Sequence, residues 1–128
     1  MRVLEENSLA ALIEKILTPS VGVITLPDGV SGASTLTKSA AGTVCCSLQL
    51  ATTVNVPPDT LVATLPEGFR PKNTLYFPAT AIWQDYNTGM AFLRIEPDGN
   101  IYASGYYTWG GAESSPLNAL YAGFSFNI

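Results

Sequence analysis

Apolar and polar residues alternate with a period of two in many short segments after Ser20, and this alternation limits the possible folds more than any other feature. A period of two sends successive side chains to opposite faces of a β-strand. Clusters of Gly, Pro, Asn and Asp separate the segments, as turns separate strands. Many short strands at regular spacing are typical of a sandwich or barrel, so we predict an all-β domain over residues 19–128, a jelly-roll-like antiparallel β-sandwich. The predicted strands cover residues 21–26, 34–38, 43–51, 52–56, 60–65, 74–77, 80–86, 89–96, 100–108 and 119–127.

Two turns have a composition that predicts their geometry. The segment from Thr64 to Pro71 contains two prolines, which hold φ near about −65° and lack an amide hydrogen, so the chain leaves one strand there and forms a corner. The clearest hairpin runs from Met90 to Tyr107, where Pro97 presets the first turn position and Gly99 can adopt a positive φ. We expect its first strand to place Ala91, Leu93 and Ile95 on one face and Phe92 and Arg94 on the other.

The corner and the hairpin together resemble a known family. The corner reads LPEGFRP over residues 65–71, the apolar strand after it reads LYFP over 75–78, and the hairpin turn reads IEPDGNI over 95–101. This combination resembles the C-terminal head domains of tail fibres and baseplate receptor-binding proteins from phages of Gram-positive bacteria, in which an LPxGxRP corner precedes an apolar strand and an IxxxGxI hairpin follows. The resemblance spans roughly residues 42–128. It implies a head domain on the virion, in a tail fibre or baseplate, that is made in the bacterial host cytoplasm and has a role in attachment. From the composition and the aromatic residues, we also expect a homotrimer and a host cell-wall saccharide as its ligand.

The composition favours burial between subunits. Hydrophobic residues make up 47% of the chain and charged residues only 12%, which is more apolar surface than a lone sandwich of this size readily buries. This agrees with a homotrimer. The net charge is −4 and the basic residues are scattered singly, so the chain offers no basic stripe to phosphates and we expect no nucleic-acid partner.

Residues 1–18 are predicted to form a short amphipathic helix that ends before Pro19, because apolar residues recur there at helical spacing. These are Leu9, Leu12, Ile13, Ile16 and Leu17. A helix this short needs a partner surface. It either forms the end of a three-chain bundle and contacts other tail or baseplate proteins, or packs on the sheet of its own domain. No apolar run approaches the roughly 20 residues that span a bilayer, and a signal-peptide pattern is absent, so we expect no membrane insertion.

The cysteines and the C-terminal run each predict a local environment. Cys45 and Cys46 are neighbours in a predicted strand, so their side chains point to opposite faces and a bond between them would distort the backbone. We expect one buried thiol and one that faces the other way. The apolar run from Ala119 to Ile128 is expected to be a paired strand, buried in the domain or along a subunit contact.

Most kinds of catalysis are disfavoured by the residues present. The chain contains no histidine, which removes the commonest general base, the commonest metal ligand and every Ser-His or Cys-His nucleophile. Most acidic residues sit in turn signals, and none forms the alternating cluster of a calcium loop. We therefore expect no catalytic residue, no metal, no cofactor and no enzyme activity. A saccharide-cleaving tail enzyme, which needs only two facing carboxylates, remains an alternative.

Aromatic residues at strand ends are the candidates for ligand binding, because sugar rings stack on Trp and Tyr while polar side chains bind the hydroxyls. Residues 83–87 and 106–111 have this composition, and both run from a strand into a loop. Alternation directs one of Tyr106 and Tyr107 inward. The candidate ligand-binding residues are Trp83, Asp85, Tyr86, Asn87, Arg94, Tyr107 and Trp109, with Arg94 included if its face is the exposed one.

The predicted function is adhesion to a host surface through a saccharide-binding head domain. A second possibility is a structural fibre or baseplate module that binds no saccharide itself and organises other receptor binders. The two differ in whether the aromatic clusters bind a ligand.

Overall fold

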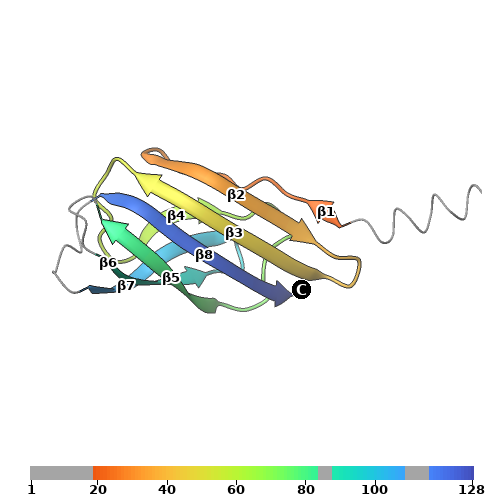
Figure 1. The fold of residues 1–128 in the computed structure, drawn as a ribbon. Helices are drawn as coiled ribbons and strands as arrows, with labels where there is room; N and C mark the ends of the chain where they lie inside the picture. The colour runs from red at the N-terminus through yellow and green to blue at the C-terminus, as the bar shows by residue number, and fades with distance from the viewer. Residues whose placement is uncertain (1–18, 84–87, 109–115) are drawn as a thin grey trace, which may run out of the picture.

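A computed structural model describes residues 19–83, 88–108 and 116–128 (Figure 1). Each described residue lies in a strand, a turn or an irregular segment, so the all-β prediction is confirmed for this part of the chain. The predicted helix over residues 1–18 lies outside the described residues. The strands are β1 (Ser20–Val21), β2 (Val30–Lys38), β3 (Thr43–Thr52), β4 (Thr60–Thr64), β5 (Leu75–Trp83), β6 (Thr88–Ile95), β7 (Asn100–Thr108) and β8 (Leu117–Asn127).

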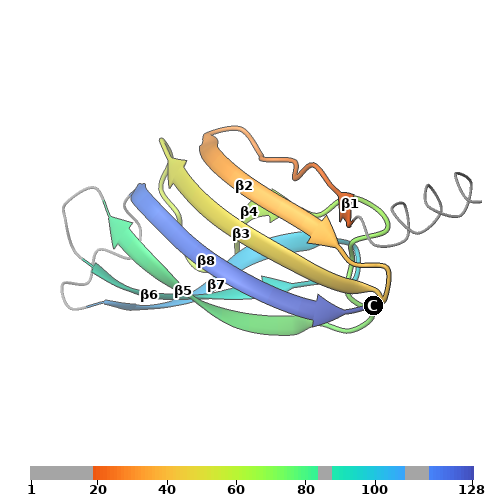
Figure 2. The same cartoon turned by 45° about the vertical axis from the view of Figure 1, so that its right-hand side comes forward.

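The strands form one antiparallel sheet in the order β1-β2-β3-β8-β5-β6-β7-β4. Figures 1 and 2 show that this sheet curls like half of a barrel, with β2, β3 and β8 on one side and β4, β6 and β7 on the other. The sequence predicted two sheets packed as a jelly-roll-like sandwich. Instead, β5 pairs with both β8 and β6 and joins the two sides through continuous hydrogen bonds. The sandwich prediction is therefore not confirmed.

A short segment after β1 links the two edges of this sheet. Through β1 the segment pairs with β2, where Ser20 lies opposite Lys38. Four residues beyond Val21, Thr25 donates its N–H to the carbonyl oxygen of Thr64 at 3.0 Å and accepts the N–H of Thr64 at 2.9 Å. Because Thr64 ends β4, the segment draws the first and last strands of the sheet together around the core.

Three strand predictions needed correction. The strand predicted over residues 21–26 shortens to β1, with an isolated bridge at Thr25. Residues 53–56 are not a strand, because the chain turns after Thr52, the last residue of β3, whose hydroxyl donates to the carbonyl oxygen of Val54 at 2.9 Å and accepts the N–H of Leu117 at 2.8 Å. The predicted strands 74–77 and 80–86 are one strand, β5, which continues through Pro78. Pairing of β5 with β8 begins only at Thr80, so Pro78 lies where β5 is still an edge strand, the position in which a sheet tolerates proline.

The concave face of the sheet holds the core. Alternation is clearest in β3, where Val44, Cys46, Leu48 and Leu50 are buried while Cys45, Ser47 and Gln49 are exposed. The prediction of one buried and one exposed thiol is therefore confirmed, with both cysteines free. The fully buried side chains with the largest volumes are Trp83, Leu36, Leu50, Leu65, Leu93, Ile95, Ile101, Leu117 and Leu120.

The predicted corner and the predicted hairpin turn lie against each other. Gly99 has a φ of 90°, as its turn requires, and its carbonyl oxygen accepts the N–H of Leu65 at 2.8 Å. A Cβ atom on Gly99 would lie 2.5 Å from the carbonyl oxygen of Leu65, so only glycine fits this approach. Arg70 donates from Nε to the same carbonyl oxygen at 3.1 Å. Two motifs that are thirty residues apart thus form one packed junction at the end of β4.

The C-terminal strand β8 lies in the middle of the sheet, between β3 and β5. Its inward side chains Leu117, Leu120, Phe124 and Phe126 are buried, and Phe124 stacks on Phe77 with ring centroids 4.9 Å apart. On the opposite face, 44% of Tyr121 remains exposed. The expectation of a paired apolar strand is confirmed, but one chain does not cover all of its large side chains.

Candidate functional site

The structure places the predicted binding residues in three different environments. Trp83, the last residue of β5, is completely buried and meets Tyr106 edge to face with ring centroids 5.3 Å apart. Trp83 therefore presents no face on which a sugar can stack, and its assignment as a ligand residue is corrected to core. Alternation alone divides a strand into two faces without telling which one is inside, and this caused the error. Tyr106 is the inward-facing tyrosine of its pair, packed against the core.

Four candidates, Asp85, Tyr86, Asn87 and Trp109, lie outside the described residues, as does the side chain of Tyr107, whose backbone pairs with Met90. The strands that carry them meet at one end of the sheet. Trp83 pairs with Leu117, Ile82 with Thr88, and Gly89 with Thr108. The two clusters that the sequence predicted separately are thus attached to neighbouring strand ends. Tertiary pairing rather than sequence proximity produces this arrangement.

Two unpaired polar groups lie beneath this end. Among the described residues, Trp83 Nε1 and Tyr106 Oη have no hydrogen-bond partner although both atoms are buried. Burial, with a smaller contribution from the charge of Asp59, raises the pKa of the Tyr106 hydroxyl well above its ordinary value. A buried unpaired donor costs about 1–3 kcal/mol.

Arg94 lies on the outer face of the sheet and is held by two carboxylates. Its Nη1 donates to Asp59 Oδ1 at 2.8 Å, and its Nε lies 2.7 Å from Glu96 Oε1 in an ion pair that is not aligned as a hydrogen bond. The guanidinium also lies over the ring of Tyr102, with Cζ 4.7 Å from the ring centroid. The hydrogen bond to Asp59, with the charge of that group and of Glu96, raises the pKa of Arg94.

The strand register brings two tyrosine side chains beside Arg94. Arg94 of β6 lies directly opposite Tyr76 of β5 on one side and Tyr102 of β7 on the other, so the three side chains form one row across the sheet. Tyr76 is 64% exposed, the largest exposed fraction among the aromatic residues that the structure describes. We call Asp59, Tyr76, Arg94, Glu96 and Tyr102 the Arg94 cluster.

Contacts outside the row of Tyr76, Arg94 and Tyr102 fix the positions of the two acidic residues of the Arg94 cluster. Asp59 has a φ of 67°, a left-handed conformation that Asp tolerates better than most residues, and its N–H donates to the carbonyl oxygen of Ala103 at 2.7 Å. Glu96 accepts the hydroxyl of Thr74 at 2.8 Å. These contacts hold the polar atoms of the cluster in place before any ligand arrives. Such a cluster can accept and donate hydrogen bonds beside an exposed aromatic ring.

The Arg94 cluster lies away from the strand end at Thr88. Arg94 lies six positions along β6 from Thr88, which corresponds to about 20 Å. Asp85, Tyr86 and Asn87 lie outside the described residues, so the role of Arg94 beside them stays a prediction. What sequence reasoning missed was Asp59, Tyr76 and Tyr102, which reach Arg94 only through strand pairing.

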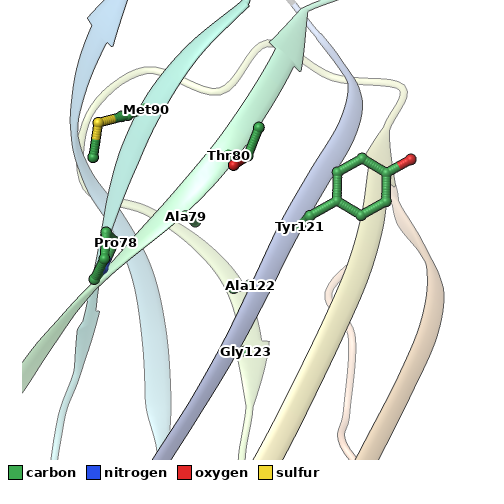
Figure 3. A pocket seen from close by; sticks show the side chains of 7 residues that line it. All are labelled: Pro78, Ala79, Thr80, Met90, Tyr121, Ala122 and Gly123. Carbon is green, nitrogen blue, oxygen red and sulfur yellow. The ribbon is translucent and has the colours of Figure 1, made fainter.

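A second feature of the outer face is an uncharged hollow of about 360 Å³ between β6, β5 and β8. Figure 3 shows Tyr121 on one side, Met90 and Pro78 on the other, and Thr80 between them. None of its lining residues carries a charge, and the polar side-chain groups are two hydroxyls. The lining residues are Pro78, Ala79, Thr80, Met90, Tyr121, Ala122 and Gly123.

Neither a metal site nor a membrane-spanning helix is found in residues 19–83, 88–108 and 116–128. Each carboxylate of the Arg94 cluster is paired with Arg94 and keeps oxygen lone pairs that can accept hydrogen bonds from a ligand. Comparisons of the chain with protein-family models, with curated proteins and with solved structures found no match.

Proposed function

We propose that this chain is the head domain of a phage or prophage tail fibre or baseplate receptor-binding protein, and that it binds a host cell-wall saccharide through the Arg94 cluster. The observation that carries the proposal is the row in which exposed Tyr76 flanks an Arg94 already held by Asp59 and Glu96. The resemblance of the LPEGFRP corner and the IEPDGNI hairpin to such head domains supports the role on the virion.

The chemistry of the Arg94 cluster favours a neutral sugar. A pyranose ring stacks its apolar face on Tyr76, while Asp59, Glu96 and the remaining guanidinium hydrogens bind hydroxyl groups. One arginine and two carboxylates sum to a charge of −1, so an anionic saccharide is repelled. Because the polar atoms are positioned in advance, binding loses little side-chain entropy.

Three finer features belong to this proposal. The first is the jelly-roll-like sandwich, supported by the way the curled sheet brings β2, β3 and β8 over β4, β6 and β7 (Figure 2). The second is the helix over residues 1–18 as a contact to neighbouring chains or tail proteins, supported by its apolar spacing. The third is the homotrimer, in which weak binding at each copy becomes firm attachment through effective concentration.

Binding to an array of cell-wall polysaccharides and oligosaccharides, followed by calorimetry on the glycans that bind, tests the proposal. We expect Tyr76→Ala and Asp59→Asn each to weaken binding about 5- to 30-fold, since each removes a stacking or charge-assisted contact worth about 1–2 kcal/mol. Val23→Ala and Glu67→Gln are matched controls, because they change an exposed apolar residue and an exposed carboxylate away from the cluster. Both controls should bind as wild type does.

Further variants separate the alternatives. If Trp109→Ala and Asp85→Ala abolish binding while Tyr76→Ala does not, the binding site lies at the loop end and the Arg94 cluster is refuted. If no glycan binds the wild-type chain, the structural-module function is supported. Release of reducing ends from host wall material indicates the saccharide-cleaving enzyme.

A further inference from the structure

The tripeptide Pro-Asp-Gly occurs twice in the sequence, at residues 27–29 and at residues 97–99, and both copies lie in turns. An aspartate that precedes glycine is prone to isomerise, because glycine has no side chain to hinder the attack of its backbone nitrogen on the aspartate carboxyl group. Both aspartates, Asp28 and Asp98, are exposed. The identical tripeptides give the two sites similar intrinsic reactivity, so a difference between them comes from the fold.

In the turn before β2, the groups that react are not held by hydrogen bonds. The N–H of Val30 donates to the carbonyl oxygen of Pro27 at 3.1 Å, and Gly29 has a φ of 83°. These are the features of a type II turn with Gly29 in its third position, whose N–H the turn does not use. Among the residues that the structure describes, neither this N–H nor the carboxylate of Asp28 has a hydrogen-bond partner. The peptide group between Asp28 and Gly29 can therefore rotate without breaking the hydrogen bond that closes the turn.

In the hairpin turn between β6 and β7, the same groups are held. Glycine occupies the last position of this turn, and the N–H of Gly99 closes it by donating to the carbonyl oxygen of Glu96 at 2.9 Å. The carboxylate of Asp98 accepts the N–H of Asn100 at 3.0 Å through Oδ1. Gly99 is also buried, and its carbonyl oxygen accepts the N–H of Leu65 at 2.8 Å. Attack of Gly99 on Asp98 therefore requires that hydrogen bonds break first.

We infer that Asp28 is a site of spontaneous isoaspartate formation in the folded protein, and that the fold protects Asp98 from the same reaction. The backbone nitrogen of Gly29 attacks the side-chain carboxyl carbon of protonated Asp28, a C–N bond forms, and the carboxyl hydroxyl leaves with the amide proton as water. Water then hydrolyses the resulting succinimide at either carbonyl carbon, which returns aspartate or gives isoaspartate. The only co-reactant is water. Neither the homotrimer nor the saccharide of the proposed function is needed for this reaction.

Isoaspartate at position 28 changes the backbone itself. It places one additional carbon atom in the main chain before Gly29 and leaves the former α-carboxyl group as the side-chain acid. The carbonyl oxygen of Gly29 accepts the N–H of Thr53 at 2.8 Å, and this bond ties the turn before β2 to the end of β3. Because the longer main chain displaces the acceptor, amide hydrogen exchange at Thr53 should be several-fold faster in the isomerised protein.

Incubation of the full chain at physiological temperature for several weeks, followed by peptide mapping with electron-transfer fragmentation, tests the inference. This fragmentation distinguishes isoaspartate from aspartate and assigns it to a position. In the folded chain we expect isoaspartate to form at position 28 at least about 10-fold faster than at position 98, because the reaction of Asp98 must first break hydrogen bonds. In urea, the unfolded chain should form isoaspartate at both positions at similar rates, since the fold no longer distinguishes them.

Two matched variants assign the signal. Asp28→Glu should abolish isoaspartate formation in the turn before β2, because the longer side chain would have to close a larger ring, and Asp98→Glu should leave the total amount nearly unchanged. Both residues are exposed, so both variants should fold as the wild type does. Equal rates at the two positions of the folded chain, or a faster rate at Asp98, overturn the inference. A folded chain that forms no isoaspartate at position 28 overturns it as well.

Discussion

The outer surface of the sheet has two halves with the same strand alternation and different chemistry. On β2 and β3 the outward residues are small or polar, with Ala33, Thr35, Cys45, Ser47 and Gln49 among them. On β5 and β6 the outward residues include Tyr76, Pro78, Met90 and Phe92. Folding of a single chain dictates the inward residues of both halves but places no comparable demand on the outward ones. Folding of one chain does not account for the large outward side chains of the second half, and the proposed saccharide contact is an explanation for Tyr76.

The largest expected effect separates buried from exposed aromatic residues within β5. Trp83→Ala should lower the free energy of unfolding by about 3–5 kcal/mol, because it leaves a large cavity in the core. Tyr76→Ala, on the same strand but exposed, should change the free energy by less than about 0.5 kcal/mol. Urea unfolding of both variants in monomeric conditions measures the difference. A loss of several kcal/mol from Tyr76→Ala would show that the outward aromatic residue serves folding, and the comparison would fail.

A second prediction compares the backbone of the two halves. Gly32 of β2 has a φ of 143°, and a Cβ atom there would lie 2.1 Å from the carbonyl oxygen of Gln49, so Gly32→Ala should destabilise the fold by about 2 kcal/mol or more. Gly105 of β7 has open space around its Cβ position, so Gly105→Ala should cost almost nothing and can stabilise slightly. Thermal unfolding of the pair checks this order. Equal effects would mean that β2 is not held closely against β3 at Gln49.

The third prediction concerns two buried ionisable side chains, Cys46 in β3 and Tyr106 in β7. Burial raises the pKa of the Cys46 thiol to about 12 from an ordinary value of 9.0, and it raises the pKa of Tyr106 as well. The folded chain then holds these protons more tightly than the unfolded chain, so stability is complete below about pH 9 and falls as pH rises. Each group contributes a slope of up to about 1.4 kcal/mol per pH unit.

Chemical unfolding between pH 7 and pH 11 measures these slopes. Cys46→Ala should flatten the loss that begins near pH 9, and Tyr106→Phe should flatten the loss that begins near pH 10. Cys45→Ala is the matched control for removal of a thiol, because the Cys45 side chain is exposed and its loss leaves the core packed. An unchanged slope in Cys46→Ala would contradict the burial of that thiol.

Local pattern predicted the local features of this molecule well. Alternation in β3 predicted that Cys45 and Cys46 face opposite ways, and Pro97 with Gly99 predicted the hairpin turn. Which strands become neighbours was not predictable in the same way. The position of β8 between β3 and β5 depends on contacts between residues far apart in the chain, and no periodicity encodes them.

The candidate site shows the same division. Arg94 could be named as a candidate from the sequence, because the local sequence gives both its position in a strand and its charge. Asp59 is 35 residues away and meets Arg94 only because β4 pairs with β7 and β7 with β6. Trp83 was wrongly assigned because aromatic composition does not distinguish a core residue from a binding platform, and only the register of β5 against β8 shows that it faces inward.

The central claim is that the Arg94 cluster binds a saccharide, and that the neighbouring uncharged surface around Thr80, Met90 and Tyr121 does not. Chemical-shift mapping by NMR, with the bound glycan titrated into the isotope-labelled chain, tests this directly. The account predicts that the amide resonances of Tyr76 and Tyr102 and the Nε resonance of Arg94 shift with the glycan, while those of Thr80, Met90 and Tyr121 do not. Shifts confined to Thr80, Met90 and Tyr121 would contradict it.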